Sequence, residues 1–129
     1  MASGVRMSVR VLIVDDLTFM RIAIREAVEE AGFVVTSEAQ NGWEALIRYT
    51  DDKPDVVLLD IAMPVMDGIT ALKKLMLLDP TACVVMCSAL GEQEMIVKAI
   101  KLGARDFVVK PFRKERVASA ITKAVKRNA

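Results

Sequence analysis

Five short apolar runs recur along the chain, and segments with a helical spacing of apolar residues separate them. The runs cover residues 9–14, 33–39, 55–60, 82–88 and 106–110. Most of these runs are continuously apolar, which is typical of strands covered on both faces of a sheet. The segments between and after them fit helices near residues 18–31, 42–50, 69–78, 92–102 and 113–127. This alternation predicts an α/β fold, in which a five-stranded parallel sheet carries helices on both faces.

Residues typical of turns and helix ends support these boundaries. Thr18 is expected to cap the first helix, and Asn41 with Gly42 marks the start of the second. Gly32 and Gly103 lie where the first and fourth helices should end, at positions that favour glycine. The pattern therefore divides the chain into helices and strands without relying on composition.

The length of 129 residues fits one domain, which we expect over residues 9–127, after a loose N-terminal leader over residues 1–8. With 18 basic and 17 acidic residues, the net charge of +1 gives no general attraction to nucleic acid or to a membrane surface. No apolar run has the length of a membrane span, and the N-terminal residues lack the apolar segment of a signal peptide. We therefore expect a cytoplasmic protein that binds neither nucleic acid nor membrane.

The residue types present also limit the chemistry. The chain has no histidine, which excludes Ser-His-Asp and Cys-His catalysis and zinc bound by histidine. Cys83 and Cys87 fall in one apolar run, on the same face of the expected strand. At the rise of a strand they lie about 13 Å apart, too far for a disulfide. We expect two buried thiols, which suits a reducing compartment.

Four of the five apolar runs end in residues that can carry chemistry. In chain order these residues are Asp15 and Asp16, then Asp60, Ser88 and Lys110. The second run ends without an obvious chemical group. Because the carboxyl ends of parallel strands share one edge of a sheet, and ligands of open α/β sheets bind at that edge, we expect these residues to converge.

Adjacent carboxylates at the end of a buried strand need a cation. Two carboxylates about 4 Å apart repel by roughly 4 kcal/mol at an effective dielectric near 20. Asp15, Asp16 and Asp60 contribute three negative charges and Lys110 one positive charge, so a divalent cation makes the sum zero. Hard oxygen ligands favour Mg²⁺.

An ionised aspartate is a nucleophile that needs no general base, and positioning with charge neutralisation drives phosphoryl transfer. The set predicts a magnesium-dependent phosphoryl acceptor.

The motifs "VLIVDD", "DVVLLDIAMPVMDG", "VVMCSA" and "DFVVKPF", in this order, resemble the receiver domain of two-component response regulators. The resemblance covers about residues 9–126 and is strongest to the single-domain chemotaxis regulators, particularly in "DDLTFMR" and "GARDFVVKPF". It implies a doubly wound, flavodoxin-like (βα)5 fold with strand order 2-1-3-4-5.

The resemblance also implies a role for each site residue. Asp60 is the implied phosphoacceptor. Asp16 is expected to bind Mg²⁺ directly, Asp15 to help through water, and the backbone carbonyl of Ala62 to complete the protein's ligands. Lys110 is expected to contact the phosphoryl group, and the peptide bond after it to be cis.

Ser88 and Phe107 form the implied switch pair, in which Ser88 moves toward the phosphoryl group and the Phe107 ring rotates inward. Threonine and tyrosine are common at these two positions in the chemotaxis regulators. Ala62 and Leu90 occupy positions whose side chains often tune hydrolysis of the acyl phosphate, and neither can orient a water molecule.

The partners implied are a histidine kinase of the chemotaxis type as phosphoryl donor and a downstream protein such as the flagellar motor switch. A phosphatase is a further candidate. The docking face is expected on the fourth helix, last strand and last helix, because the fourth helix is apolar over more than one stripe. We expect a monomer that catalyses its own phosphorylation and slow autodephosphorylation, without enzymatic turnover.

Three other functions compete with this interpretation. A phosphatase with an aspartyl-phosphate intermediate often has an acid two residues after the nucleophile, where this chain has Ala62. A flavodoxin-like cofactor binder needs a phosphate-binding loop after the first strand, but the loop here, "DDLT", is acidic and lacks glycine. A receiver domain cut from a longer regulator with a different output stays open. The basic last helix fits nucleic acid, an acidic partner or plain solvent contact.

Overall fold

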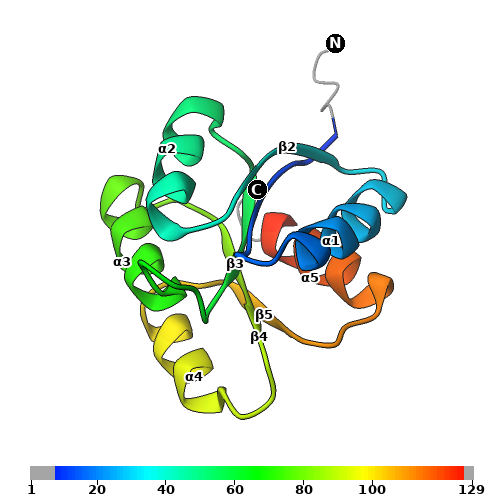
Figure 1. The fold of residues 1–129 in the computed structure, drawn as a ribbon. Helices are drawn as coiled ribbons and strands as arrows, with labels where there is room; N and C mark the ends of the chain where they lie inside the picture. The colour runs from blue at the N-terminus through cyan, green and yellow to red at the C-terminus, as the bar shows by residue number, and fades with distance from the viewer. Residues whose placement is uncertain (1–7, 127–129) are drawn as a thin grey trace.

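The structure, a computed structural model, describes residues 8–126. Strands and helices alternate along these residues (Figure 1). The strands are β1 (Arg10–Val14), β2 (Val34–Ala39), β3 (Val56–Asp60), β4 (Val84–Ser88) and β5 (Asp106–Val109). The helices are α1 (Thr18–Glu30), α2 (Gly42–Asp52), α3 (Gly68–Leu78), α4 (Gln93–Lys101) and α5 (Lys114–Lys126). Residues 1–7 of the expected leader and residue 127 of the expected domain lie outside the described residues, and Ser8 precedes β1.

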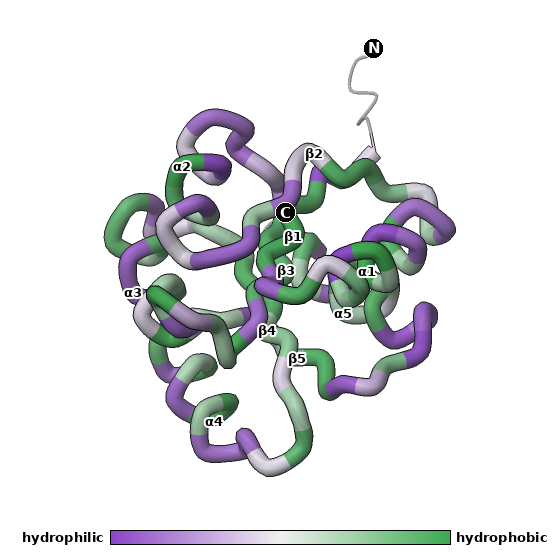
Figure 2. Tube along the Cα trace, viewed as in Figure 1, coloured by the Kyte–Doolittle hydropathy of each residue, from purple (hydrophilic) through white to green (hydrophobic). Residues whose placement is uncertain are grey.

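The five strands pair in parallel in the order β2-β1-β3-β4-β5, which confirms the expected flavodoxin-like sheet. Helices α1 and α5 pack on one face, and α2, α3 and α4 pack on the other (Figure 1). Successive side chains of a strand point to opposite faces. Val11 and Ile13 of β1 therefore join the core under α1 and α5, whereas Leu12 and Val14 join the core under the other three helices. Two cores on one sheet explain why most of the apolar runs are continuous. In Figure 2 the central strands of the sheet are mostly hydrophobic.

Most of the expected helix boundaries are confirmed. The Asn41 side chain accepts a hydrogen bond from the Glu44 N–H at 2.9 Å and so caps α2. Gly32 and Gly103, with φ of 87° and 117°, follow α1 and α4 in the left-handed region that favours glycine.

The expected cap of the first helix is wrong. The cap position of α1 is Leu17, which makes no side-chain cap, and Thr18 is already helical. The carboxylate of Asp15 instead accepts a hydrogen bond from the Leu17 N–H at 2.9 Å. An acidic residue two positions before the cap residue therefore fixes the entry into α1, because its side chain reaches forward over the turn.

Both cysteines are buried free thiols in the core under α1 and α5, as expected. Burial raises the pKa of the Cys87 thiol to about 12, and Asp60 and Asp15 add to this while Lys110 opposes it. Within residues 8–126, none of the helices is both long and apolar enough to cross a membrane.

Candidate functional site

The carboxyl edge of the sheet gathers the charged residues that the sequence predicts there. The Lys110 ammonium, just past β5, lies 2.7 Å from Oδ2 of Asp15 and 3.2 Å from Oδ1 of Asp60. Asp15 is fully buried and Asp60 is 5% exposed. Two buried carboxylates therefore share one lysine, although the three residues are 45 to 95 positions apart in the chain.

The donor set fits a divalent cation. Carboxylate oxygens of Asp15, Asp16 and Asp60 all lie within 4.8 Å of one another. Oxygen ligands lie about 2.1 Å from Mg²⁺, so two ligands on opposite sides of the ion are about 4 Å apart. The three oxygens thus need only a small adjustment to bind one ion, and all are hard donors of the kind that Mg²⁺ prefers.

The two adjacent aspartates differ in how the protein holds them. Asp15 donates its N–H to the carbonyl of Ala39 at 3.0 Å, and its carboxylate accepts from Leu17 and Lys110. Asp16 is partly exposed, and within residues 8–126 its carboxylate makes no hydrogen bond or ion pair. The carboxylate of Asp16 is therefore free to bind a ligand, whereas that of Asp15 is oriented by the protein.

Burial and neighbouring charges set the ionisation of Asp60. Burial raises the pKa of its carboxyl to about 6, the Lys110 charge opposes that rise, and the charges of Asp15 and Asp16 add to it. For Lys110, burial lowers the pKa, but the hydrogen bond to Asp15 and the charges of Asp60 and Asp15 outweigh it, so the pKa is raised. Asp60 is thus mostly ionised at neutral pH, and Lys110 stays charged beside it.

The loop between β3 and α3 approaches the site closely. A Cβ added to Gly68 would lie 2.1 Å from the Asp60 carbonyl oxygen, so no side chain fits there. The Gly68 N–H donates to the Ile61 carbonyl at 2.7 Å and so closes the loop. Ala62 is exposed at the start of this loop, and the role of its carbonyl stays a prediction. Val65 has a φ of 72°, which is rare for a β-branched residue.

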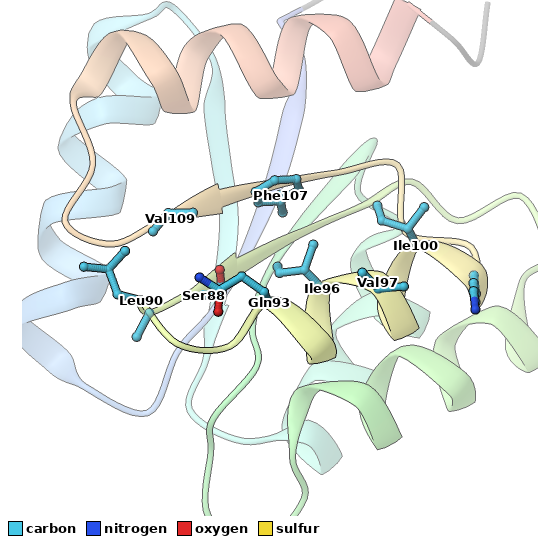
Figure 3. A pocket seen from close by; sticks show the side chains of 10 residues that line it. Ser88, Leu90, Gln93, Ile96, Val97, Ile100, Phe107 and Val109 are labelled. Carbon is cyan, nitrogen blue, oxygen red and sulfur yellow. The ribbon is translucent and has the colours of Figure 1, made fainter.

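Ser88 and Phe107 line one cavity of about 540 Å³ between α4 and β5. Figure 3 shows Ile96 and Ile100 of α4 pointing toward Phe107 across this cavity. The Lys110 N–H donates to the Ser88 carbonyl at 2.6 Å, which joins the ends of β4 and β5. The Lys110–Pro111 peptide bond is cis, as expected. The two residues predicted to switch therefore lie at one apolar groove, next to the charged edge.

Two residues that support the site were not predicted from the sequence: one contacts Asp15, and the other holds the first. Arg21 of α1 donates to the Asp15 carbonyl at 2.6 Å and pairs with Glu38 of β2 at 3.0 Å. The second apolar run, which seemed to end without a chemical group, thus contributes Glu38 from within its strand. The sequence position of Arg21 could have indicated this contact. Arg21 lies in the first turn of α1, close enough in sequence for its side chain to reach back to Asp15.

The fold and this edge define a receiver domain. A family model, the response regulator receiver domain, matches residues 11–122. The chain belongs to this family and is a two-component response regulator.

The chain is similar over nearly its whole length to proteins called chemotaxis protein CheY. It is 54% identical to that of Listeria monocytogenes over 117 residues, which cover 91% of this chain and 98% of the relative. It is 50% identical to that of Thermotoga maritima over 120 residues, 93% of this chain and 100% of the relative.

Solved structures show the same fold. The complex of CheX and CheY with BeF3 and Mg²⁺ from Borrelia burgdorferi matches with a TM-score of 0.85 and 38% identity, over 89% of this chain and 87% of that chain. NtrX from Brucella abortus matches with a TM-score of 0.89 and 31% identity over 95% of this chain, which spans 28% of that longer chain.

Proposed function

We propose that this protein accepts a phosphoryl group on Asp60 from a histidine kinase and signals to another protein through α4, β5 and α5. One observation carries the proposal. A buried carboxylate with a pKa of about 6, two further carboxylates and a lysine meet at the carboxyl edge of a receiver sheet. This is the charge pattern that a phosphoryl group with a divalent cation would complete.

The chemistry follows from the residues present. A carboxylate oxygen of Asp60 forms a bond to phosphorus, while the bond from phosphorus to the donor's histidine nitrogen breaks. That nitrogen keeps the electron pair and takes up a proton. Asp16, Asp60 and the carbonyl of Ala62 would bind Mg²⁺ directly, and Asp15 would bind it through water. The ion would neutralise charge on the phosphoryl oxygens. Lys110, 3.2 Å from Asp60, is positioned to bind a phosphoryl oxygen once the carboxylate has become an acyl phosphate.

The groove between α4 and β5 is the proposed output surface. Ser88 is close enough along the sheet edge to respond to a phosphoryl group, because its carbonyl already accepts from the Lys110 N–H. The cavity beside Phe107 leaves room for its ring to move. Met95, Val97 and Ile100 are 39 to 54% exposed on α4, so apolar area is available to a partner.

The names of the relatives, chemotaxis protein CheY, support a place in chemotaxis. We propose the flagellar motor switch as the target protein, as the sequence resemblance implies. The complex of CheX with CheY shows that a similar protein binds a second protein in the presence of BeF3 and Mg²⁺, and we propose a phosphatase as a further partner of this chain. We propose that the protein acts in the cytoplasm as a monomer, and that it catalyses its own phosphorylation and slow autodephosphorylation without turning over other substrates. The match within the longer NtrX chain keeps a receiver joined to a different output as the second candidate.

The acceptor chemistry is tested by intact mass after incubation with acetyl phosphate, with and without Mg²⁺. The wild type and Asp67→Asn should each gain one phosphoryl group in the presence of Mg²⁺. Asp67 is a matched control, because it lies in the same region and asparagine preserves its cap on α3. Asp60→Asn should gain none. An adduct on Asp60→Asn, or no adduct on freshly treated wild type, would overturn the proposal.

The output surface is tested with the phosphorylated protein and the isolated motor-switch protein. Val97→Asp should weaken binding at least tenfold, whereas Ile47→Asp should not change it. These residues are 54% and 58% exposed, on α4 and α2, so the two variants introduce the same charge at equal exposure. Ile96 is a poorer choice, because it packs against the core. Equal affinity of both variants would exclude α4 as the docking helix.

A further inference from the structure

The residues around Asp15 form a support that connects the charged edge to β2, a strand that contributes none of the predicted site residues. Glu38 of β2 accepts a hydrogen bond from Arg21 Nε at 3.0 Å, and Arg21 Nη1 donates to the Asp15 carbonyl at 2.6 Å. The third nitrogen of the guanidinium, Nη2, donates to Thr18 Oγ1 at 3.2 Å. All three nitrogens of Arg21 are therefore engaged, in three different directions.

The side chains of Arg21 and Glu38 are buried enough to hold the guanidinium in one orientation. The side chain of Arg21 is 14% exposed and that of Glu38 is 29% exposed. The planar guanidinium keeps its donors at fixed angles, so holding Glu38 on one side determines where Nη1 points on the other. A partly buried charge pair of this kind fixes orientation more reliably than an exposed one.

The carbonyl that Arg21 holds belongs to the peptide bond between Asp15 and Asp16. A peptide unit is planar, so fixing its oxygen fixes the plane that leads into Asp16. The N–H of Asp15 is held separately by Ala39, the neighbour of Glu38 in β2. Because the Asp16 carboxylate is itself unheld within residues 8–126, its backbone is what the protein can orient.

We infer that Arg21, oriented by Glu38, is a positioning residue that aims the Asp16 carboxylate at the Mg²⁺ site. The inference rests on the proposed function, because it needs the acidic cluster to bind a cation. Residues that orient metal ligands typically change metal affinity by about 10-fold to 100-fold when they are altered. Arg21 reaches a ligand through its backbone, so we expect the lower end of that range.

The sign of the effect separates positioning from electrostatics. Arg21 is positively charged and lies beside the cation site, so its charge disfavours Mg²⁺ binding. If only charge mattered, Arg21→Gln would bind Mg²⁺ more tightly than the wild type. If Arg21 positions Asp16, the same variant should bind Mg²⁺ about 10-fold more weakly.

Arg25 provides a matched control one helical turn further along α1. It also pairs with Glu38, at 2.7 Å, but its other hydrogen bond goes to Glu29 rather than to Asp15. Arg25→Gln removes the same charge and the same partner, and it should bind Mg²⁺ as well as the wild type or slightly more tightly. Arg21→Lys keeps the positive charge but lacks the planar guanidinium that holds Glu38 and the Asp15 carbonyl together. This variant should therefore also bind Mg²⁺ more weakly than the wild type, by at least threefold.

The experiment is calorimetric titration of each purified variant with MgCl2, with urea unfolding to show that each is folded. Weaker binding by Arg21→Gln and Arg21→Lys, with unchanged binding by Arg25→Gln, supports the inference. If a folded Arg21 variant binds Mg²⁺ as tightly as the wild type or more tightly, the inference is overturned. If Arg21→Gln does not fold, Arg21→Lys alone tests the inference. Absence of saturable binding by the wild type itself overturns the cation site, and the positioning role falls with it.

Discussion

Replacing Asp60 by asparagine should stabilise the protein at neutral pH in the absence of Mg²⁺. The Asp60 carboxyl is 5% exposed and has a pKa of about 6 in the fold, compared with an ordinary value of 3.8. A raised folded-state pKa means that the protonated form is favoured by folding, so ionisation costs stability. The difference of about two pKa units corresponds to about 3 kcal/mol once the group is fully ionised in both states.

The pH dependence follows from the same two values. For an acid with a raised pKa, stability is highest below both values and falls as the pH rises from about 4 to about 6. Ionisation of Asp60 therefore lowers the free energy of unfolding by about 1 kcal/mol at pH 4.5 and by about 3 kcal/mol at pH 7.5. The advantage of Asp60→Asn should therefore shrink by about 2 kcal/mol between these conditions. Lys110 keeps its closer partner, Asp15 at 2.7 Å, in the variant.

Urea unfolding at 25 °C with EDTA measures both quantities. Asp51→Asn, a change at an exposed aspartate of α2, controls for the general loss of one negative charge and should leave stability within about 0.5 kcal/mol of wild type. Added Mg²⁺ should stabilise the wild type and not Asp60→Asn, because ligands stabilise the state that binds them. The reasoning is refuted if Asp60→Asn is no more stable than the wild type at pH 7.5, or if its advantage is the same at both pH values.

Three further predictions concern residues around the site and in the core. Gly68→Ala should lower the free energy of unfolding by about 2 kcal/mol, because its Cβ would lie 2.1 Å from the Asp60 carbonyl oxygen; an unchanged urea midpoint would contradict this close approach. Tyr49→Phe should cost about 1 kcal/mol in urea unfolding, through loss of the 2.7 Å hydrogen bond from its hydroxyl to Asp79. Cys87, buried and with a pKa near 12, should not react with a disulfide reagent at pH 8 until the protein unfolds, and mass spectrometry of the folded protein would reveal any labelling.

The sheet was predictable because its central strands β1, β3 and β4 are buried on both faces, which produces continuous apolar runs. The convergence of Asp15, Asp60 and Lys110 was predictable because parallel topology places strand ends at one edge. Neither argument depends on side-chain conformation. Both therefore hold at the level of a sequence pattern.

The contacts between α1 and its surroundings could not be predicted in the same way. The interaction of Arg21 with Glu38 depends on the angle at which α1 crosses β2, which no local spacing encodes. The expected cap at Thr18 was wrong for a related reason. Asp15 reaches forward to the Leu17 N–H because its backbone is held by β2, and this takes the place of a local cap.

The hydrogen bond from the Lys110 N–H to the Ser88 carbonyl, at 2.6 Å, makes the charged edge and the apolar groove parts of one backbone unit. Lys110 faces the carboxylates, and Ser88 lines the cavity beside Phe107. Thermodynamic linkage then works in both directions. If phosphorylation of Asp60 changes the free energy of binding a ligand in the groove, that ligand must change the free energy of phosphorylating Asp60 by the same amount. A target protein on α4 would thus be an effector of the acceptor site as well as its reader.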